Sequence, residues 1–222
     1  MLIAAAVCPH PPLLVPELAG AAAPELDRLR AACSAAVAAV RAADAEVLVV
    51  VGAGERTREY GARAAGSLQP WGVDVRAGDG EPVLPLSLTI GRWLLGEAPD
   101  GFQAVAGDAP TAECLALGER LAAGRRTALL VMADGSAKLG EKAPGYLDPG
   151  APPYQERWSK ALAEADAAAL AALDPAEAEA LWAGGRAALQ VLAGAAGGAA
   201  LEGGLLAEIA PYGVGYSVAV WT

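Results

Sequence analysis

Continuous apolar runs alternate with segments of helical periodicity along this chain. Apolar runs that end at or near glycine or proline are typical of buried strands and occupy residues 2–8, 46–52, 102–105 and 127–132, with a weaker candidate at 72–76. Segments with apolar side chains at helical spacing predict amphipathic helices over residues 24–43, 86–95 and 111–123. Strands that alternate with helices in this way predict βαβ units and therefore parallel strands.

The last third of the chain is predicted to be helical and to finish in a β-hairpin. Residues 153–173 predict a long helix, and Asp174-Pro175-Ala176-Glu177 combines the N-cap acid, early proline and glutamate that begin a new one. The region is predicted to hold two consecutive helices, and a third is an open alternative. Residues 205–212 and 216–221 predict two strands joined by Gly213-Val214-Gly215.

Together these elements predict an α/β fold. We expect a single-domain α/β sandwich over residues 1–222, with a central, mostly parallel mixed sheet flanked by helices and a C-terminal β-hairpin. A chain of 222 residues lies within the range of single α/β domains and can bury a core without disulfides. Neither a repeat nor a long polar linker divides it.

Charge and hydropathy exclude two kinds of partner. The chain has 26 acidic and 16 basic residues and a net charge of -10, so it lacks the positive surface that nucleic acids require. A long uncharged run in the last third of the chain, residues 187–201, is mostly alanine and glycine and is too short to span a bilayer. We expect no nucleic acid and no membrane partner; a small-molecule ligand and a homo-oligomer are both compatible with the sequence.

Cysteine usage and the first residues indicate the compartment. The three cysteines, Cys8, Cys33 and Cys114, are widely spaced and odd in number, which is not a disulfide framework. The first basic residue is Arg28, so the apolar start lacks the basic region of a signal peptide. A soluble cytoplasmic protein is expected, and the 56 alanines favour a bacterial source with a GC-rich genome.

The single histidine, His10, is the first candidate for chemistry. It follows the first predicted strand in Cys8-Pro9-His10-Pro11-Pro12, where the prolines fix the backbone. Open α/β folds bind their ligands at the carboxyl ends of parallel strands, and a neutral imidazole there is a good metal ligand or general base. The alternative is a structural histidine that binds a backbone carbonyl in a rigid turn.

Asp134 and Ser136 are candidates at a second strand end. They follow the strand 127–132 and open a glycine-rich loop, 133–150, of the kind that often carries function. If this strand lies beside the first, Asp134 and Ser136 join His10 as catalytic candidates. The alternative is that both residues only cap the turn.

Glu55 is the candidate at a third strand end. It follows Gly52-Ala53-Gly54 and, if its strand neighbours the first, could be an oxygen ligand beside His10 in a metal site. A solvated ion pair with Arg56 is the alternative. The glycines lack the third member of a dinucleotide fingerprint, and the chain also lacks a P-loop, a G-x-S-x-G elbow and the cysteines and histidines of a zinc cluster.

A resemblance joins these motifs. The segment Pro9-His10-Pro11-Pro12-Leu13-Leu14-Val15-Pro16-Glu17 resembles the N-terminal motif of the LigB-like class III extradiol ring-cleavage dioxygenases, a superfamily that includes the Memo proteins. The valine-rich strand, Asp134-Gly135-Ser136 and Gly213-Val214-Gly215-Tyr216 follow in matching order. The resemblance implies an α/β sandwich, a catechol-type aromatic substrate, and Fe(II) held by two histidines and a glutamate.

Only one chemical position of this pattern is retained. His10 matches the first iron ligand, whereas Gly52-Ala53-Gly54 stands where the second histidine is expected. The carboxylate ligand falls near residues 186–188, where there is no acid, and the acid/base histidine corresponds to Ala137. Two hypotheses follow. The chain is a divergent enzyme, for which Fe(II) is implied by the resemblance alone, or it is a noncatalytic module that binds a small molecule or a partner chain and has no cofactor.

Overall fold

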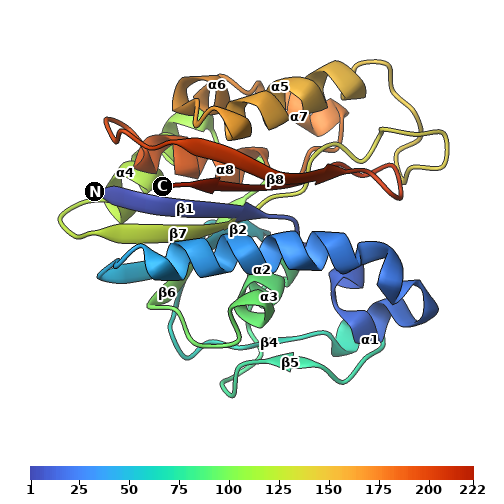
Figure 1. The fold of residues 1–222 in the computed structure, drawn as a ribbon, viewed down its shortest axis with the longest axis horizontal. Helices are drawn as coiled ribbons and strands as arrows, with labels where there is room; N and C mark the ends of the chain where they lie inside the picture. Colours follow the sequence, from blue (N-terminus) through green and yellow to red (C-terminus); the bar gives the residue numbers. More distant parts are fainter.

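A seven-stranded mixed sheet runs through the middle of the molecule, between two layers of helices (Figure 1). The computed structural model describes residues 1–222. In spatial order the strands are β3 (Arg58–Gly61), β6 (Gly101–Ala106), β2 (Val47–Gly54), β7 (Thr127–Met132), β1 (Leu2–Cys8), β9 (Tyr216–Trp221) and β8 (Gly203–Ile209). The predicted α/β sandwich is confirmed as one compact domain.

The centre of the sheet is parallel and its edges are antiparallel. Strands β6, β2, β7 and β1 pair in parallel, whereas β3, β9 and β8 pair antiparallel. In the register of the three central strands, Met132 of β7 lies between Cys8 of β1 and Gly52 of β2. The residues that follow β1, β7 and β2 therefore emerge at the same edge of the sheet.

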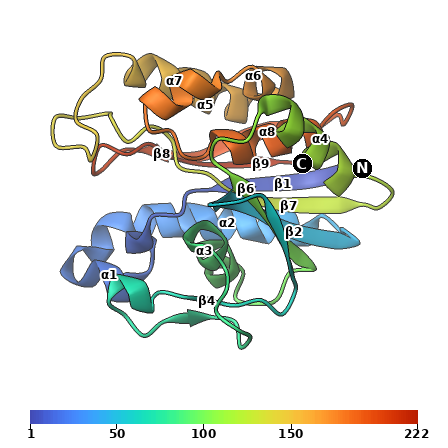
Figure 2. The ribbon, with the colours of Figure 1, turned by 180° about the vertical axis from the view of Figure 1, so that it is seen from behind.

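Helices cover both faces of the sheet (Figures 1 and 2). One face carries α2 (Asp27–Ala42) and α3 (Leu86–Leu95), together with six short elements: η1 (Pro12–Leu14), α1 (Pro16–Ala19), η2 (Gly20–Leu26), β4 (Gly66–Ser67), η3 (Gln69–Trp71) and β5 (Arg76–Ala77). The other face carries α4 (Thr111–Leu121), α5 (Ala151–Ala163), α6 (Ala167–Ala171), α7 (Pro175–Ala180) and α8 (Arg186–Ala195).

Two apolar cores result, one on each face. Strand β1 contributes to both, because successive side chains of a strand point to opposite faces: Ala5 and Val7 join one core, and Ala4 and Cys8 join the other. Every residue of β7 is buried, as expected for a central parallel strand. None of the helices combines the length and the hydropathy of a membrane-spanning segment.

Several predicted elements differ from the structure. Residues 72–75 are not a strand, because Gly72, with φ of 95°, ends a 3-10 turn there; of the predicted stretch only Arg76 is in a strand, as the first residue of β5. The predicted helix 153–173 breaks at Ala165, whose φ is 50°, and Asp166 then caps α6 with a 2.9 Å bond from the Ala169 amide. Strand β3 was not predicted, and the region expected to hold two or three helices holds four, of which α8 is the last.

Candidate functional site

His10 and Asp134 meet at the carboxyl edge of the sheet. Their strands, β1 and β7, are neighbours, and beyond them the Ala133 amide donates a 2.9 Å hydrogen bond to the Cys8 carbonyl. The backbone N–H of His10 then donates to Oδ1 of Asp134 at 2.7 Å. The same carboxylate oxygen lies 3.6 Å from Nδ1 of the imidazole. The convergence predicted for these two residues is therefore present.

The surroundings of the His10 imidazole favour one of its two neutral tautomers. The His10 and Asp134 side chains are only 13% and 21% exposed, and Nδ1 has no hydrogen-bond partner of its own. Because the nearest charged atom to Nδ1 is a carboxylate oxygen, the tautomer with hydrogen on Nδ1 is favoured electrostatically. This leaves the Nε2 lone pair as the acceptor that the site can offer.

Tyr216 is a third polar side chain close to Asp134. It begins β9, which runs antiparallel to β1, so its position lies at the edge where β1 ends. Burial raises the pKa of the Tyr216 phenol, and the nearby Asp134 carboxylate raises it further, so the phenol stays protonated at neutral pH. Sequence reasoning missed Tyr216, although an antiparallel strand that follows a hairpin necessarily starts at this edge.

Ser136 is engaged in holding the loop. The residue is fully buried, and its hydroxyl donates a 2.7 Å hydrogen bond to the Leu181 carbonyl while accepting one of 3.2 Å from the Lys138 amide. Its own amide donates to Oε1 of Gln155. These contacts tie the loop that follows β7 to α5 and to the end of α7, which is the role of a turn-capping residue.

Glu55 lies apart from His10. Glu55 is exposed, and its carboxylate forms no ion pair. Strand β7 separates β2 from β1, so the strands that carry Glu55 and His10 are about 10 Å apart, twice the spacing of paired strands. Glu55 was expected beside His10 only if β2 and β1 were neighbouring strands, and they are not.

The residues present do not fit the iron site that the resemblance implies. No group of three or more histidine, cysteine or acidic side chains is placed to hold a metal ion. A Cβ at Gly54 would lie 2.9 Å from Cβ of Ala104, so a ligand side chain at residue 54 would require a shift of the sheet. The position that corresponds to the carboxylate ligand carries the buried cation Arg186.

Comparisons with known proteins support the fold. Neither a protein-family model nor a curated protein matches the chain. Among solved structures, the crystal structure of uncharacterized protein JW3007 from Escherichia coli K12 matches with a TM-score of 0.61 and 14% sequence identity, over 99% of this chain and 99% of that chain. At this level of identity the two proteins are similar in fold and in extent, and the likeness carries no chemistry from one to the other.

Proposed function

We propose that this chain is a divergent relative of the LigB-like ring-cleavage dioxygenases that binds a small molecule beside His10 and Asp134 and moves a proton with His10. The observation that carries the proposal is the position of the Asp134 carboxylate, 2.7 Å from the backbone nitrogen of His10 and 3.6 Å from its Nδ1. A carboxylate beside one ring nitrogen holds the imidazole in the tautomer whose other nitrogen can accept a proton.

The proton transfer has a simple form. Nε2 of His10 accepts the proton of an acidic hydroxyl on the ligand, and the charge on the resulting imidazolium is balanced by Asp134. Tyr216, whose phenol remains protonated, supplies a hydroxyl donor at the same edge of the sheet. The resemblance suggests a phenol or catechol as the ligand class. Because the donor set does not fit iron, ring cleavage is not part of the proposal.

A second candidate is binding without turnover. It is favoured by Ser136, because the hydroxyl nearest to the His10–Asp134 pair in sequence already donates to the Leu181 carbonyl. The pair therefore has no serine nucleophile to activate. On this reading the same site recognises a small molecule or a partner chain through a neutral imidazole.

The single histidine makes the site directly observable by ¹⁵N NMR of the imidazole. We expect the Nδ1–H tautomer in the wild-type protein, and changes in the Nε2 resonance when catechol is added. Formation of the catecholate band in the near-ultraviolet difference spectrum, lost in His10→Gln, would support proton transfer. Binding without that band would favour the noncatalytic module, and unchanged imidazole resonances over a panel of phenols would contradict both.

Metal content provides the complementary test. Protein purified without chelator is expected to contain no stoichiometric iron, zinc or manganese, and added Fe(II) is expected to produce no oxygen consumption with catechol. Stoichiometric metal that disappears in His10→Ala, or oxygen consumption that depends on His10, would restore the dioxygenase interpretation and overturn the proposal.

A further inference from the structure

A buried arginine without an acidic partner lies next to a cavity on the helical layer that contains α7 and α8. Arg186, the first residue of α8, is only 3% exposed. Its guanidinium donates to neutral oxygens alone: the carbonyls of Ala109 at 2.7 Å and Gly107 at 2.6 Å, and Oε1 of Gln190 at 2.9 Å. None of the six ion pairs of the protein includes it. Carbonyls satisfy hydrogen bonds but do not neutralise the charge, so this cation still lacks a counter-charge.

The cavity beside Arg186 has a volume of about 610 Å³, which is the size of a small-molecule site. Arg186 is a buried part of its wall, whereas the two acids of the lining, Asp108 and Glu179, are exposed. The cavity also lies at the N-terminal end of the ten-residue helix α8, where the helix dipole adds positive potential. The buried guanidinium therefore attracts an anion, and the two exposed acids of the lining favour a single negative charge over a double one.

Trp182 forms an unusual part of the same wall. Its amide donates to the Glu179 carbonyl and the Ala183 amide to the Ala178 carbonyl, the two hydrogen bonds of a Schellman motif at the end of α7. Trp182 occupies the left-handed position of that motif, with φ of 53°, where glycine is the usual residue. The side chain is nevertheless 55% exposed, so burial in the core does not account for a tryptophan at this position.

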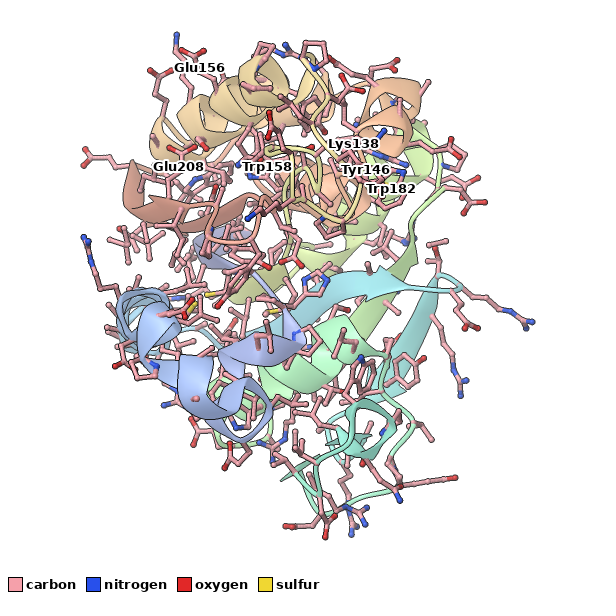
Figure 3. All side chains as sticks on the ribbon, turned by 90° about the vertical axis from the view of Figure 1, so that its right-hand side faces the viewer. Lys138, Tyr146, Glu156, Trp158, Trp182 and Glu208 are labelled. Carbon is pink, nitrogen blue, oxygen red and sulfur yellow. The ribbon has the colours of Figure 1, made fainter.

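Lys138 packs against Trp182 and is paired with Asp148, whose Oδ2 lies 3.9 Å from its Nζ. Nζ of Lys138 lies 5.6 Å from the centroid of the Trp182 ring. Figure 3 shows Lys138, Tyr146 and Trp182 gathered on one side of the molecule, away from Glu156 and Glu208. The charge of Lys138 is balanced by Asp148, and Arg186 is the only basic residue of the cavity lining.

We infer that this cavity binds an organic monocarboxylate with a flat apolar body, the carboxylate paired with the Arg186 guanidinium and the body lying against Trp182. A guanidinium matches a carboxylate in shape as well as in charge. The site is separate from the His10–Asp134 pair, although a 2.9 Å hydrogen bond from the Gly185 amide to the Asp134 carbonyl joins the two through the backbone. The inference does not depend on proton transfer by His10.

Benzoate, its neutral isostere benzamide, and inorganic phosphate test the site by calorimetric titration of the full chain. We expect benzoate to bind at least about tenfold more tightly than benzamide, a ratio equivalent to about 1.4 kcal/mol, because only benzoate forms a charge-assisted pair with the guanidinium. Phosphate is expected to bind more weakly than benzoate, because it lacks the apolar body and carries more charge. Equal affinity for benzoate and benzamide, or no binding of benzoate, would overturn the inference.

Substitutions at residue 184 test the charge of the cavity without altering Arg186. Gly184 lines the cavity, and a Cβ there would meet no atom within 4 Å, so the backbone accepts the Cβ of either substituted side chain. Gly184→Glu places a carboxylate in the site and is expected to weaken benzoate at least about tenfold. Gly184→Ala, the matched control, should leave the affinity within twofold. Equal effects of the two substitutions would contradict the inference.

Arg186 and Trp182 are tested in the same titration. Arg186→Lys keeps the charge but loses the planar fork, and we expect it to weaken benzoate several-fold; Arg126→Gln, at an exposed arginine on the opposite edge, should have no effect. Trp182→Gly is expected to weaken benzoate and to leave phosphate unchanged. If Trp182→Gly left the affinity for benzoate unchanged, Trp182 would not contact the ligand and this part of the inference would be wrong. If phosphate bound as tightly as benzoate, the site would bind an adventitious ion only.

Discussion

Oδ1 of Asp134 lies 2.7 Å from the backbone nitrogen of His10 and 3.6 Å from its Nδ1, so one carboxylate oxygen both fixes the proline-rich turn and faces the imidazole. Asp134→Ala removes both interactions and is expected to lower the free energy of unfolding by about 1–3 kcal/mol, because a partly buried amide loses its acceptor. Urea denaturation measures this change.

Asp134→Asn separates the two roles of the carboxylate. The amide oxygen can still accept from the His10 backbone, so we expect most of the stability to remain. The negative charge that favours hydrogen on Nδ1 is lost, so the ¹⁵N spectrum of the imidazole should shift toward the Nε2–H tautomer. An unchanged tautomer would show that Asp134 does not orient the ring.

Ser136→Ala is expected to affect stability rather than ligand binding. The substitution leaves the buried Leu181 carbonyl without the 2.7 Å hydrogen bond from the serine hydroxyl, which should cost about 1–3 kcal/mol. Denaturation measures the stability, and the imidazole shifts measured with catechol should match those of the wild type. Loss of catechol binding in a fully folded Ser136→Ala protein would return Ser136 to the site.

Trp182→Gly is expected to raise the free energy of unfolding by up to about 1 kcal/mol. The residue has φ of 53°, and glycine adopts this conformation without the steric cost that a side chain incurs. More than half of the Trp182 surface is exposed, so the indole contributes little to packing in the core. Thermal and urea denaturation test the effect; a clear loss of stability would show that the indole packs more productively than its 55% exposure indicates.

Gly194→Ala is expected to destabilise the protein by about 2 kcal/mol or more. Helices α4 and α8 cross in backbone contact: a Cβ at Gly194 would lie 2.1 Å from the Leu115 carbonyl oxygen, and one at Gly118 would lie 2.0 Å from the Val191 carbonyl oxygen. Gly61→Ala is the control, because a Cβ there meets no atom within 4 Å and the change should stay within about 0.5 kcal/mol. Equal stability of the two variants would contradict this packing.

Stability is expected to fall at alkaline pH. Burial raises the pKa of the Tyr154 phenol above its ordinary value of about 10, and the Glu177 carboxylate raises it further. The unfolded chain therefore releases this proton first, so the stabilisation is complete below about pH 10 and is lost as the pH rises toward the folded pKa. The expected slope from Tyr154 is about 1.4 kcal/mol per pH unit, since one proton separates the two states.

Substitution by phenylalanine isolates this contribution. Tyr154→Phe should flatten the alkaline part of the profile measured by urea denaturation. At neutral pH it should preserve or increase stability, because the Tyr154 hydroxyl is buried and makes no hydrogen bond to the protein. Tyr216→Phe should flatten the profile further, since burial and Asp134 also raise the pKa of Tyr216. If the pH profile of Tyr154→Phe were identical to that of the wild type, Tyr154 would not be a source of the loss of stability at alkaline pH.

The elements that the sequence predicted best are those with sharp local boundaries. Strand Thr127–Met132 is apolar throughout after its first residue, and helix Leu86–Leu95 starts after Pro85 and ends at Gly96, whose φ is 69°. Strand β3 was missed because Arg58–Gly61 is an edge strand with mostly exposed residues and shows no apolar alternation. The break at Ala165 was missed because alanine-rich sequence favours continuing a helix.

The candidate site was partly predictable for a similar reason. His10 and Asp134 could be placed together because each directly follows a strand that is recognisable from sequence. The separation of Glu55 from His10 depends on strand order, and no local pattern indicated that β7 lies between β1 and β2. Arg186 could not be recognised as buried, because its cavity is built from the 107–109 loop, α7 and α8 together.

The place of β1 in the sheet sets an order of assembly. Its partners are β7, more than a hundred residues later in the chain, and β9, which is later still. Pairings over such long stretches of chain form slowly, because the intervening loop must be closed before the contacts stabilise it. The apolar segment Leu2–Cys8 therefore remains without its sheet partners while most of the chain is synthesised. The His10–Asp134 pair forms only after β1 has paired with β7.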